Sequence, residues 1–394
     1  MRRRSFLAWA LTPILAVAIP ATAACGTNNE PTATAVSTEG GWRALPDSPL
    51  SPREQAVGLW TGTEVLLLGG SDAQPCPVNA DCPMDPTPLR DGAAVDPGTG
   101  RWRRLADAPV PLLATSAVVA GQTAYLLPLP VWDRPAEDEV LAYDLAGDRW
   151  RRLPVPFRLA DGYALVAVGE RVIAYHGSDE AAEGSDYLWD PGTRRWQALP
   201  DDPLGPSFDR SAVWTGQEIV MFGRELVANP GAERPSVARA AALDLASGAW
   251  RALPDSQILS TAPWLVDGGR LINPTLGGAD GGQVGNYGRV YPYGGVLEPA
   301  TGRWAPLPDP PGVEAQQSAG AFAGATAVYP EADGPVLDTA GNRWLGIPAA
   351  PGGEVSGRSI VAAGRDLLVF GGASWASADG TLLNGASVWS PPRG

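Results

Sequence analysis

The chain has 394 residues, of which 43 are acidic and 29 are basic, and every basic residue is an arginine. The formal net charge of −14 repels phosphate backbones and therefore disfavours nucleic acid as a partner. One histidine and three cysteines leave too few ligands for a zinc or copper centre, so we expect no metal and no cofactor.

Residues 1–25 predict an export signal, because Arg2–Arg4 precede an apolar run of about 15 residues, shorter than the roughly 20 needed to cross a bilayer. RRSFL fits the twin-arginine pattern, and TAAC before Gly26 resembles a lipoprotein processing site with Cys25 acylated. A plain secretory signal is the alternative. Residues 26–40 predict a flexible tether, so we expect a monomeric, extracytoplasmic protein with a lipid anchor in the membrane.

From residue 41 onward one cassette recurs. An acidic residue opens a short turn, a Trp follows six residues later, and an aliphatic residue, usually followed by Pro, stands three residues after the Trp. The acids of the complete copies are Asp96, Asp144, Asp190, Asp244, Glu298 and Asp338. Residues 41–46 (GWRALP) hold only the second half of a copy. Cassette tryptophans lie 40 to 60 residues apart, a period that indicates a repeat architecture.

Each cassette predicts a β-hairpin in which the acid caps the turn and the Trp starts a strand. Two further β-type runs precede it, such as 55–60 and 65–70 in the first unit. Four strands joined by short turns, without helical periodicity, are typical of one blade of a β-propeller. We expect the cassette acids and tryptophans to be structural rather than catalytic.

This arrangement resembles the kelch repeat over residues 41–390. The resemblance rests on the Gly pairs at 69–70 and 371–372, on aromatic–Asp pairs such as 143–144 and 189–190, and on the cassette Trp. It implies an all-β fold, a seven-bladed kelch-type β-propeller over residues 41–394. The segment from Arg358 to Pro391 supplies three strands without a cassette Trp, so we expect residues 41–46 to complete that blade and close the ring.

Three arginines, Arg53, Arg210 and Arg358, are predicted to open the innermost strands of their blades. In kelch rings such arginines lie near the central funnel and can meet a ligand carboxylate; salt bridges to neighbouring acids are the alternative. His176 is predicted to replace the first Gly of the Gly pair in the third blade. As the only histidine it cannot assemble the copper site of a galactose oxidase-type enzyme.

The long segments fall on one side of the predicted ring, here called the long-loop face. They are 71–90, 127–138, 176–186, 224–238, 275–294 and 373–384. Long loops on a rigid scaffold are typical of binding surfaces. The candidate partner-binding residues there, beside the three arginines, are Trp132, Asp133, Arg134, His176, Arg224, Tyr287 and Trp375. Cys76 and Cys82 in the first of these segments predict a disulfide.

No nucleophile, phosphate-loop or dinucleotide motif occurs in the chain. We therefore expect a non-catalytic binding or scaffold protein of the cell envelope that recognises a protein or a glycan through the long-loop face. The alternative that the resemblance implies is an exported carbohydrate-active kelch enzyme of the sialic acid mutarotase or epimerase type. Such enzymes need no metal.

Overall fold

The computed structural model describes residues 41–76, 87–113, 116–128, 138–177, 184–225, 234–281, 288–308, 320–324, 326–328, 336–345, 351–353, 355–377 and 379–391. The chain divides into Met1–Ala35 and Val36–Gly394, and all described residues belong to the second unit, which alone is discussed below. Within the described ranges a membrane-spanning helix is not found.

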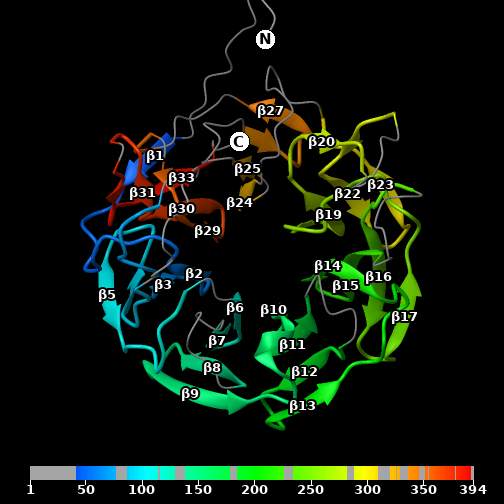
Figure 1. Cartoon of the computed structure of the whole chain (residues 1–394), viewed down its shortest axis with the longest axis horizontal. Helices are drawn as coiled ribbons and strands as arrows, with labels where there is room; N and C mark the ends of the chain where they lie inside the picture. The colour runs from blue at the N-terminus through cyan, green and yellow to red at the C-terminus, as the bar shows by residue number, and fades with distance from the viewer. Residues whose placement is uncertain are drawn as a thin grey trace, which may run out of the picture. The chain divides into compact units, whose positions relative to one another are not determined.

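Antiparallel sheets of four strands dominate the described ranges, which contain seven of them, and Figure 1 shows them arranged around a common centre. We number them sheet 1 to sheet 7. Sheet 1 is β2 (Val57–Trp60), β3 (Val65–Leu68), β4 (Gly92–Val95) and β5 (Trp102–Leu105). Sheet 2 is β6 (Ser116–Ala120), β7 (Thr123–Leu127), β8 (Glu139–Asp144) and β9 (Arg149–Pro154). Sheet 3 is β10 (Tyr163–Val168), β11 (Arg171–His176), β12 (Tyr187–Asp190) and β13 (Arg195–Ala198).

The next three sheets follow the same order along the chain. Sheet 4 is β14 (Ser207–Trp214), β15 (Ile219–Glu225), β16 (Arg239–Asp244) and β17 (Ala249–Ala252). Sheet 5 is β18 (Leu265–Asp267), β19 (Arg270–Asn273), β22 (Gly295–Glu298) and β23 (Arg303–Ala305). Sheet 6 is β24 (Ala321–Ala323), β25 (Thr326–Val328), β26 (Val336–Asp338) and β27 (Arg343–Leu345).

Sheet 7 combines strands from both ends of the described chain. Its members are β29 (Ser359–Ala363), β30 (Asp366–Phe370), β33 (Ala386–Ser390) and β1 (Gly41–Ala44). Strand β1 runs antiparallel to β33, with Trp42 opposite Trp389. The all-β propeller class predicted from the sequence is therefore confirmed.

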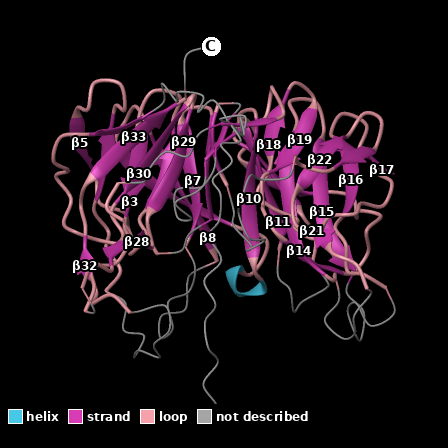
Figure 2. Ribbon diagram, turned by 90° about the horizontal axis from the view of Figure 1, so that it is seen from above, coloured by secondary structure: helices cyan, strands magenta, loops and turns pink. Residues whose placement is uncertain are grey.

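Two of the long segments are more regular than the sequence predicted. Segment 275–294 contains the paired strands β20 (Gly278–Ala279) and β21 (Tyr291–Pro292). Segment 373–384 contains β31 (Ala373–Ser374) and β32 (Thr381–Leu382), which form a small sheet with β28 (Val355–Ser356). Figure 2 shows β21, β28 and β32 on the same side of the sheets as the 3-10 turn η1 (Leu159–Asp161). Short pairs of this kind escape periodicity, because two residues show no alternation.

The cassette acids cap their turns, as the sequence predicted. Asp96 Oδ1 accepts hydrogen bonds from the backbone N–H groups of Gly98 and Thr99 at 2.8 and 3.2 Å. The Thr99 hydroxyl also donates to this carboxylate, and these bonds hold the pKa of Asp96 below its usual value. A carboxylate that accepts hydrogen bonds from otherwise unpaired turn amides stabilises the hairpin. Its role is therefore structural.

The cassette tryptophans join consecutive sheets. In six cassettes the indole Nε1–H donates to the carbonyl of the residue four positions after the preceding cassette Trp. The pairs are Trp102 to Pro46 (3.0 Å), Trp150 to Ala106 (2.8 Å), Trp196 to Pro154 (3.2 Å), Trp250 to Pro200 (2.8 Å), Trp304 to Pro254 (2.9 Å) and Trp344 to Pro308 (3.3 Å). The bond of Trp102 links sheet 1 to the chain leaving β1 of sheet 7.

The apolar core lies between the sheets. Six clusters of buried side chains each combine residues from two adjacent sheets, and a seventh joins sheet 6 to Leu276 and Leu307, which follow strands of sheet 5. One of them contains Val65 and Leu67 of sheet 1 together with Leu368 and Phe370 of sheet 7. Because the second strands are covered on both faces, they read as continuous apolar runs; all four residues of β3 are buried. Each sheet therefore depends on its two neighbours for burial.

Deleting residues 41–46 should expose the edge of β33 and remove the acceptor of Trp102, so the protein should aggregate or lose several kcal/mol of stability. Urea unfolding of the truncated and intact proteins measures the loss. Deletion of residues 26–38 is the control and should leave the unfolding midpoint unchanged. Equal midpoints for the two truncations would show that β1 does not close the ring.

Candidate functional site

The structure describes some of the predicted site residues and leaves others outside. Arg53, His176, Arg210, Arg224, Arg358, Trp375 and Cys76 lie in described ranges. Trp132, Asp133, Arg134, Tyr287, Cys25 and Cys82 lie outside them. The lipidation of Cys25 and the disulfide between Cys76 and Cys82 therefore stay predictions.

Arg53 is buried and saturated with hydrogen bonds. Its side chain is 1% exposed, and its guanidinium forms a bidentate pair with Asp91 at 2.7 and 3.0 Å. The remaining donors reach the carbonyls of Gly69 and Ser51 and the Ser51 hydroxyl. The expectation that Arg53 meets a ligand at the funnel is therefore wrong. Its planar fork matches a carboxylate so well that the buried ion pair, the alternative noted above, is what forms.

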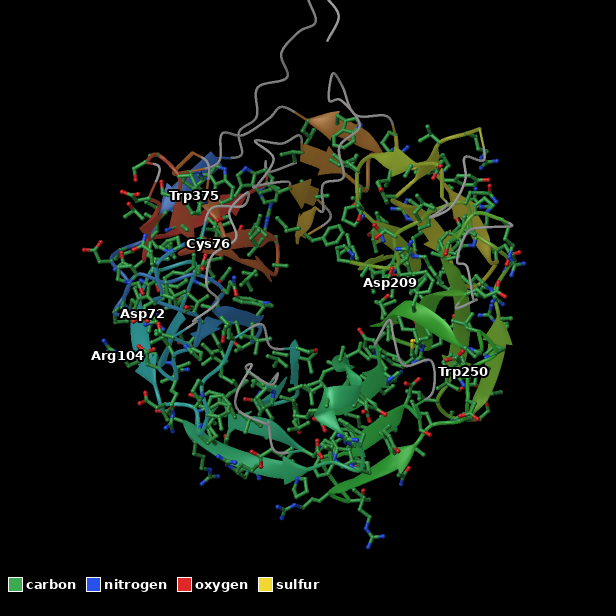
Figure 3. All side chains as sticks on the ribbon, in the orientation of Figure 1. Asp72, Cys76, Arg104, Asp209, Trp250 and Trp375 are labelled. Atoms are coloured by element: carbon green, nitrogen blue, oxygen red, sulfur yellow. The ribbon has the colours of Figure 1, made fainter. Side chains whose placement is uncertain are left out.

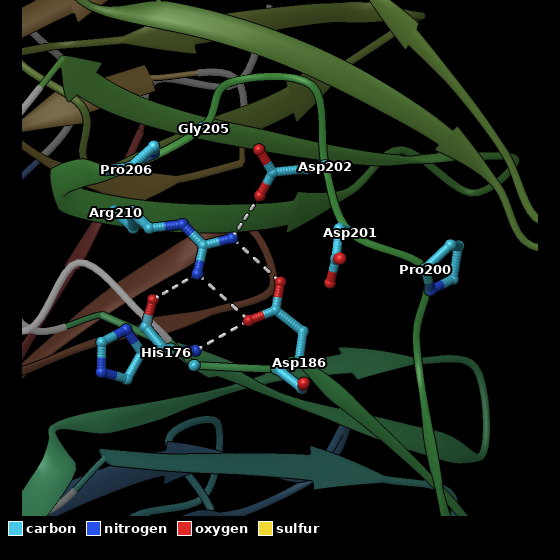
Figure 4. A pocket seen from close by; sticks show the side chains of 10 residues that line it. His176, Asp186, Pro200, Asp201, Asp202, Gly205, Pro206 and Arg210 are labelled. Atoms are coloured by element: carbon cyan, nitrogen blue, oxygen red, sulfur yellow. Dashed lines mark hydrogen bonds and ion pairs between the residues drawn. The ribbon is translucent and has the colours of Figure 1, made fainter.

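Arg210 is the centre of a buried ionic network. Its Nη1 and Nη2 donate to Asp186 at 3.1 and 2.9 Å, and Nη2 also donates to Asp202 at 2.6 Å (Figure 4). All three side chains are at most 8% exposed. A further bond of 2.6 Å runs from Nη1 to the carbonyl of His176. Arg210 lies within β14 of sheet 4, whereas His176 ends β11 of sheet 3 and Asp186 directly precedes β12 of sheet 3. The network therefore fastens two sheets together.

His176 takes the position of the first Gly of the Gly pair, as the sequence predicted. The cassette register shows this, because Trp196 pairs with Trp189 and Trp189 with Val172, as Trp102 pairs with Val95 and Val95 with Val65. His176 lies four residues after Val172, as Gly69 lies four residues after Val65. Figure 4 shows the imidazole turned away from the Asp186 and Asp201 carboxylates.

The surroundings keep this imidazole neutral. Burial, and then the charge of Arg210, lower the pKa of His176. The Tyr163 ring meets it edge-on at 5.4 Å, and Gly184 lies so close that a Cβ there would be 2.9 Å from the imidazole. Within the described part of the chain its Nε2 has no hydrogen-bond partner. A neutral ring enclosed in this way does not reach the nearby carboxylates.

A cavity of about 330 Å³ lies beside the Arg210 network. Its lining includes Asp186, Asp201, Asp202 and Arg210. Asp201 is exposed, whereas the other three side chains pair with one another. Three carboxylates and one guanidinium give the lining a formal charge of 1 − 3 = −2. An anionic ligand is disfavoured here, and a neutral ligand with hydroxyl groups to donate is favoured.

Arg358 belongs to a second cavity, of about 400 Å³, along the first strands of sheets 7, 1 and 2. Gln55, Gly58, Ala117 and Ile360 contribute to the same lining. The Arg358 Nη2 donates to the carbonyl of Pro351. Of the three predicted arginines, Arg358 alone lines a cavity without a carboxylate in its lining.

Trp375 is packed rather than free. Its indole Nε1 donates to Ser356 Oγ at 2.9 Å, and a Cβ at Gly380 would lie 2.7 Å from its ring. Gln74, from the first long segment, donates to the carbonyl of Asp379 in the same hairpin. Trp375 is half-buried, so its expected role as an exposed anchor stays a prediction.

Arg224 forms a pair that sequence reasoning missed. Its Nη2 donates to Asp209 Oδ2 at 2.5 Å, and its guanidinium lies over the Phe208 ring at 5.2 Å from the centroid. The Asp209 side chain is 40% exposed and that of Arg224 is 27% exposed. Figure 3 shows Asp209 at the inner edge of the ring of sheets. Nothing in the sequence signals this pair, because the two residues come from different strands.

Replacing Arg210 by Ala should destabilise the protein by about 3–5 kcal/mol, because two buried carboxylates lose their counter-charge. Urea unfolding at neutral pH measures this change. Arg194→Ala, at an exposed turn position, is the matched control and should shift stability by less than about 0.5 kcal/mol. Equal midpoints for the two variants would contradict the network as a structural fastening.

Comparisons with known proteins give one weak likeness. No family model matches the chain. It is 26% identical over 201 residues to the N-acetylneuraminate epimerase of Yersinia enterocolitica, a match that covers 41% of this chain and 50% of the relative. The chain therefore spans about half the length of this curated relative. Together with the all-strand architecture, the likeness fits a kelch-type propeller family.

Proposed function

We propose that this protein is a non-catalytic binding protein of the cell envelope that recognises a neutral glycan through its long-loop face. One observation carries the proposal: in the cavity at Arg210, Asp186 and Asp202 are committed to the guanidinium, and the His176 ring turns away. General acid–base catalysis needs a titratable group within reach of the substrate and free to exchange its proton. Among the cavity's described charged groups only Asp201 is exposed. A site built in this way is suited to bind rather than to transform.

The chemistry of the cavity supports a sugar without a carboxylate. Carboxylate and backbone oxygens accept hydrogen bonds from hydroxyl groups, which glycans supply in number. The lining charge of −2 repels an anionic sugar. The name of the Yersinia relative points to a sugar substrate for that protein, which supports a carbohydrate rather than a protein as the ligand of this one.

An exported carbohydrate-active enzyme is the second candidate, and the likeness to N-acetylneuraminate epimerase is the observation that favours it. That reading requires an acid and a base near the bound sugar. Asp201 is one group that could serve as a base, and its partner would have to come from residues that the structure does not describe. The two candidates differ in a measurable way, because an enzyme converts its ligand and a binding protein releases it unchanged.

The full chain carrying Cys25→Ser should bind one or more neutral oligosaccharides on a glycan array and leave them unchanged by proton NMR. Asp201→Asn should weaken that binding about tenfold, because a charged acceptor at the cavity is lost. Asp255→Asn is the matched control, since Asp255 follows the next Leu-Pro in the chain, is exposed, and lies outside the cavity lining.

Three other results would contradict the proposal. Epimerisation or mutarotation of a sugar would favour the second candidate. A stoichiometric protein partner, together with no glycan binding, would show that the ligand is a protein and not a glycan. Stronger binding of sialylated than of neutral glycans would show that the charge of the cavity does not select the ligand.

We further propose that the protein is held at the membrane by acyl chains on Cys25, because TAAC-Gly26 resembles a lipoprotein processing site. Cys25→Ser should release the protein into the medium, because several acyl chains bind a bilayer stably and the variant lacks the cysteine that carries them. Immunoblots of membrane and medium fractions measure the change. An unchanged membrane fraction for the variant would show that Cys25 is not the anchor.

A further inference from the structure

Two equivalent positions in the sheets carry glycine in sheet 7 and charged residues in sheet 4. Ser359 pairs with Phe370 in sheet 7 as Ser211 pairs with Phe222 in sheet 4. The first position lies two residues before the serine, and it holds Gly357 in sheet 7 and Asp209 in sheet 4. The second position lies two residues after the phenylalanine, and it holds Gly372 in sheet 7 and Arg224 in sheet 4. The paired register thus identifies Asp209 and Arg224 as a joint departure from the repeat.

The first position requires a left-handed backbone in each sheet compared. The φ angles are 64° at Gly357, 50° at Asp209 and 57° at Gln55, which holds the same position in sheet 1. Only glycine adopts this region without steric cost. Asp209 therefore keeps a carboxylate where glycine would be the unstrained choice, and such residues concentrate at ligand-binding sites.

The contact between the two side chains does not account for this choice. Asp209 is 40% exposed, and ion pairs at that exposure contribute little to stability. The pair also leaves hydrogen-bonding capacity unused. Within the described part of the chain the Arg224 Nε is buried without a partner, and no bond to the Asp209 Oδ1 is found there. The Asp209 carboxylate thus lies against the Arg224 guanidinium, and Figure 3 shows Asp209 at the inner edge of the ring of sheets.

We propose that Asp209 and Arg224 form a diol-binding pair for a neutral sugar. The carboxylate accepts a hydrogen bond from one hydroxyl group, and the guanidinium donates to the oxygen of the adjacent hydroxyl. This inference rests on the proposed function and names the part of the sugar that the site recognises. The charges of the pair cancel, and the next residue, Arg210, lines the cavity of charge −2, so neither feature favours an anionic group.

Asp209→Gly tests the pair, because glycine fits the left-handed backbone that Asp209 adopts. In the full chain carrying Cys25→Ser, this variant should bind the best neutral oligosaccharide of the array about 10- to 100-fold more weakly, while the urea midpoint stays unchanged. Gln55→Gly makes the same substitution at the equivalent position of sheet 1 and should alter neither quantity. O-methylation of one of two adjacent hydroxyls of the ligand should weaken wild-type binding by a similar factor.

Unchanged affinity of Asp209→Gly for that oligosaccharide would overturn the proposal. So would an equal loss in Gln55→Gly, which would assign the effect to the backbone. Should Asp209→Gly fail to fold, Arg224→Gly decides the question, since glycine occupies that position in sheets 1 and 7. If the wild-type chain binds no neutral glycan at all, the proposed function itself fails. If it binds and both variants bind equally well, only the pair is wrong.

Discussion

The hydrogen bond from the Trp of each complete cassette to a carbonyl that follows the preceding cassette Trp is the constraint on which the architecture depends. A four-stranded sheet with two apolar faces cannot bury either of them alone, so it must be stacked at a fixed angle and register between two others. The indole supplies both needs, because its ring fills the space between sheets and its Nε1–H fixes one atom of the neighbour, as Trp250 does with Pro200. The cassette spacing follows from this geometry. The third residue after the Trp packs inward, as Leu253 does, and the fourth, Pro254, presents its carbonyl to the next indole.

Arginine performs the corresponding task where polar groups are buried. Arg53 donates to Asp91 and to the carbonyl of Gly69, and Arg210 donates to the buried Asp186 and to the carbonyl of His176. Carboxylates neutralise the charges of these arginines, and the lining of the cavity beside Arg210 keeps a net negative charge. A fold that uses arginine as an internal fastening therefore does not also offer those arginines to an anionic ligand. This distinction separates the site from one built to attract a carboxylate.

Stability shared among equivalent interfaces leaves single positions free to vary. Because seven apolar clusters hold the sheets, one sheet can depart from the repeat at its inner end at little cost to the whole. Sheet 4 does this at Asp209 and Arg224, where sheet 7 keeps glycine. On the long-loop face the small sheet of β28, β31 and β32 lies beside Trp375, whose indole donates to Ser356 of β28. Departures from the repeat are thus local, and the repeated hydrogen bonds from the cassette tryptophans are kept.

The sequence by itself determined the repeat, the all-β propeller class, the capping role of acids such as Asp96 and the structural role of the cassette tryptophans. These features depend on residues close in sequence or on a spacing that recurs, and both are visible in one dimension. The tertiary structure decided which side chains remain available. Arg53, Arg210 and Arg358 are the same residue type, yet the roles of Arg53 and Arg210 differ from that of Arg358 because both are buried against carboxylates distant in sequence. Asp209 meets Arg224 across the pairing of β14 with β15, at a register irregularity that one strand alone does not reveal.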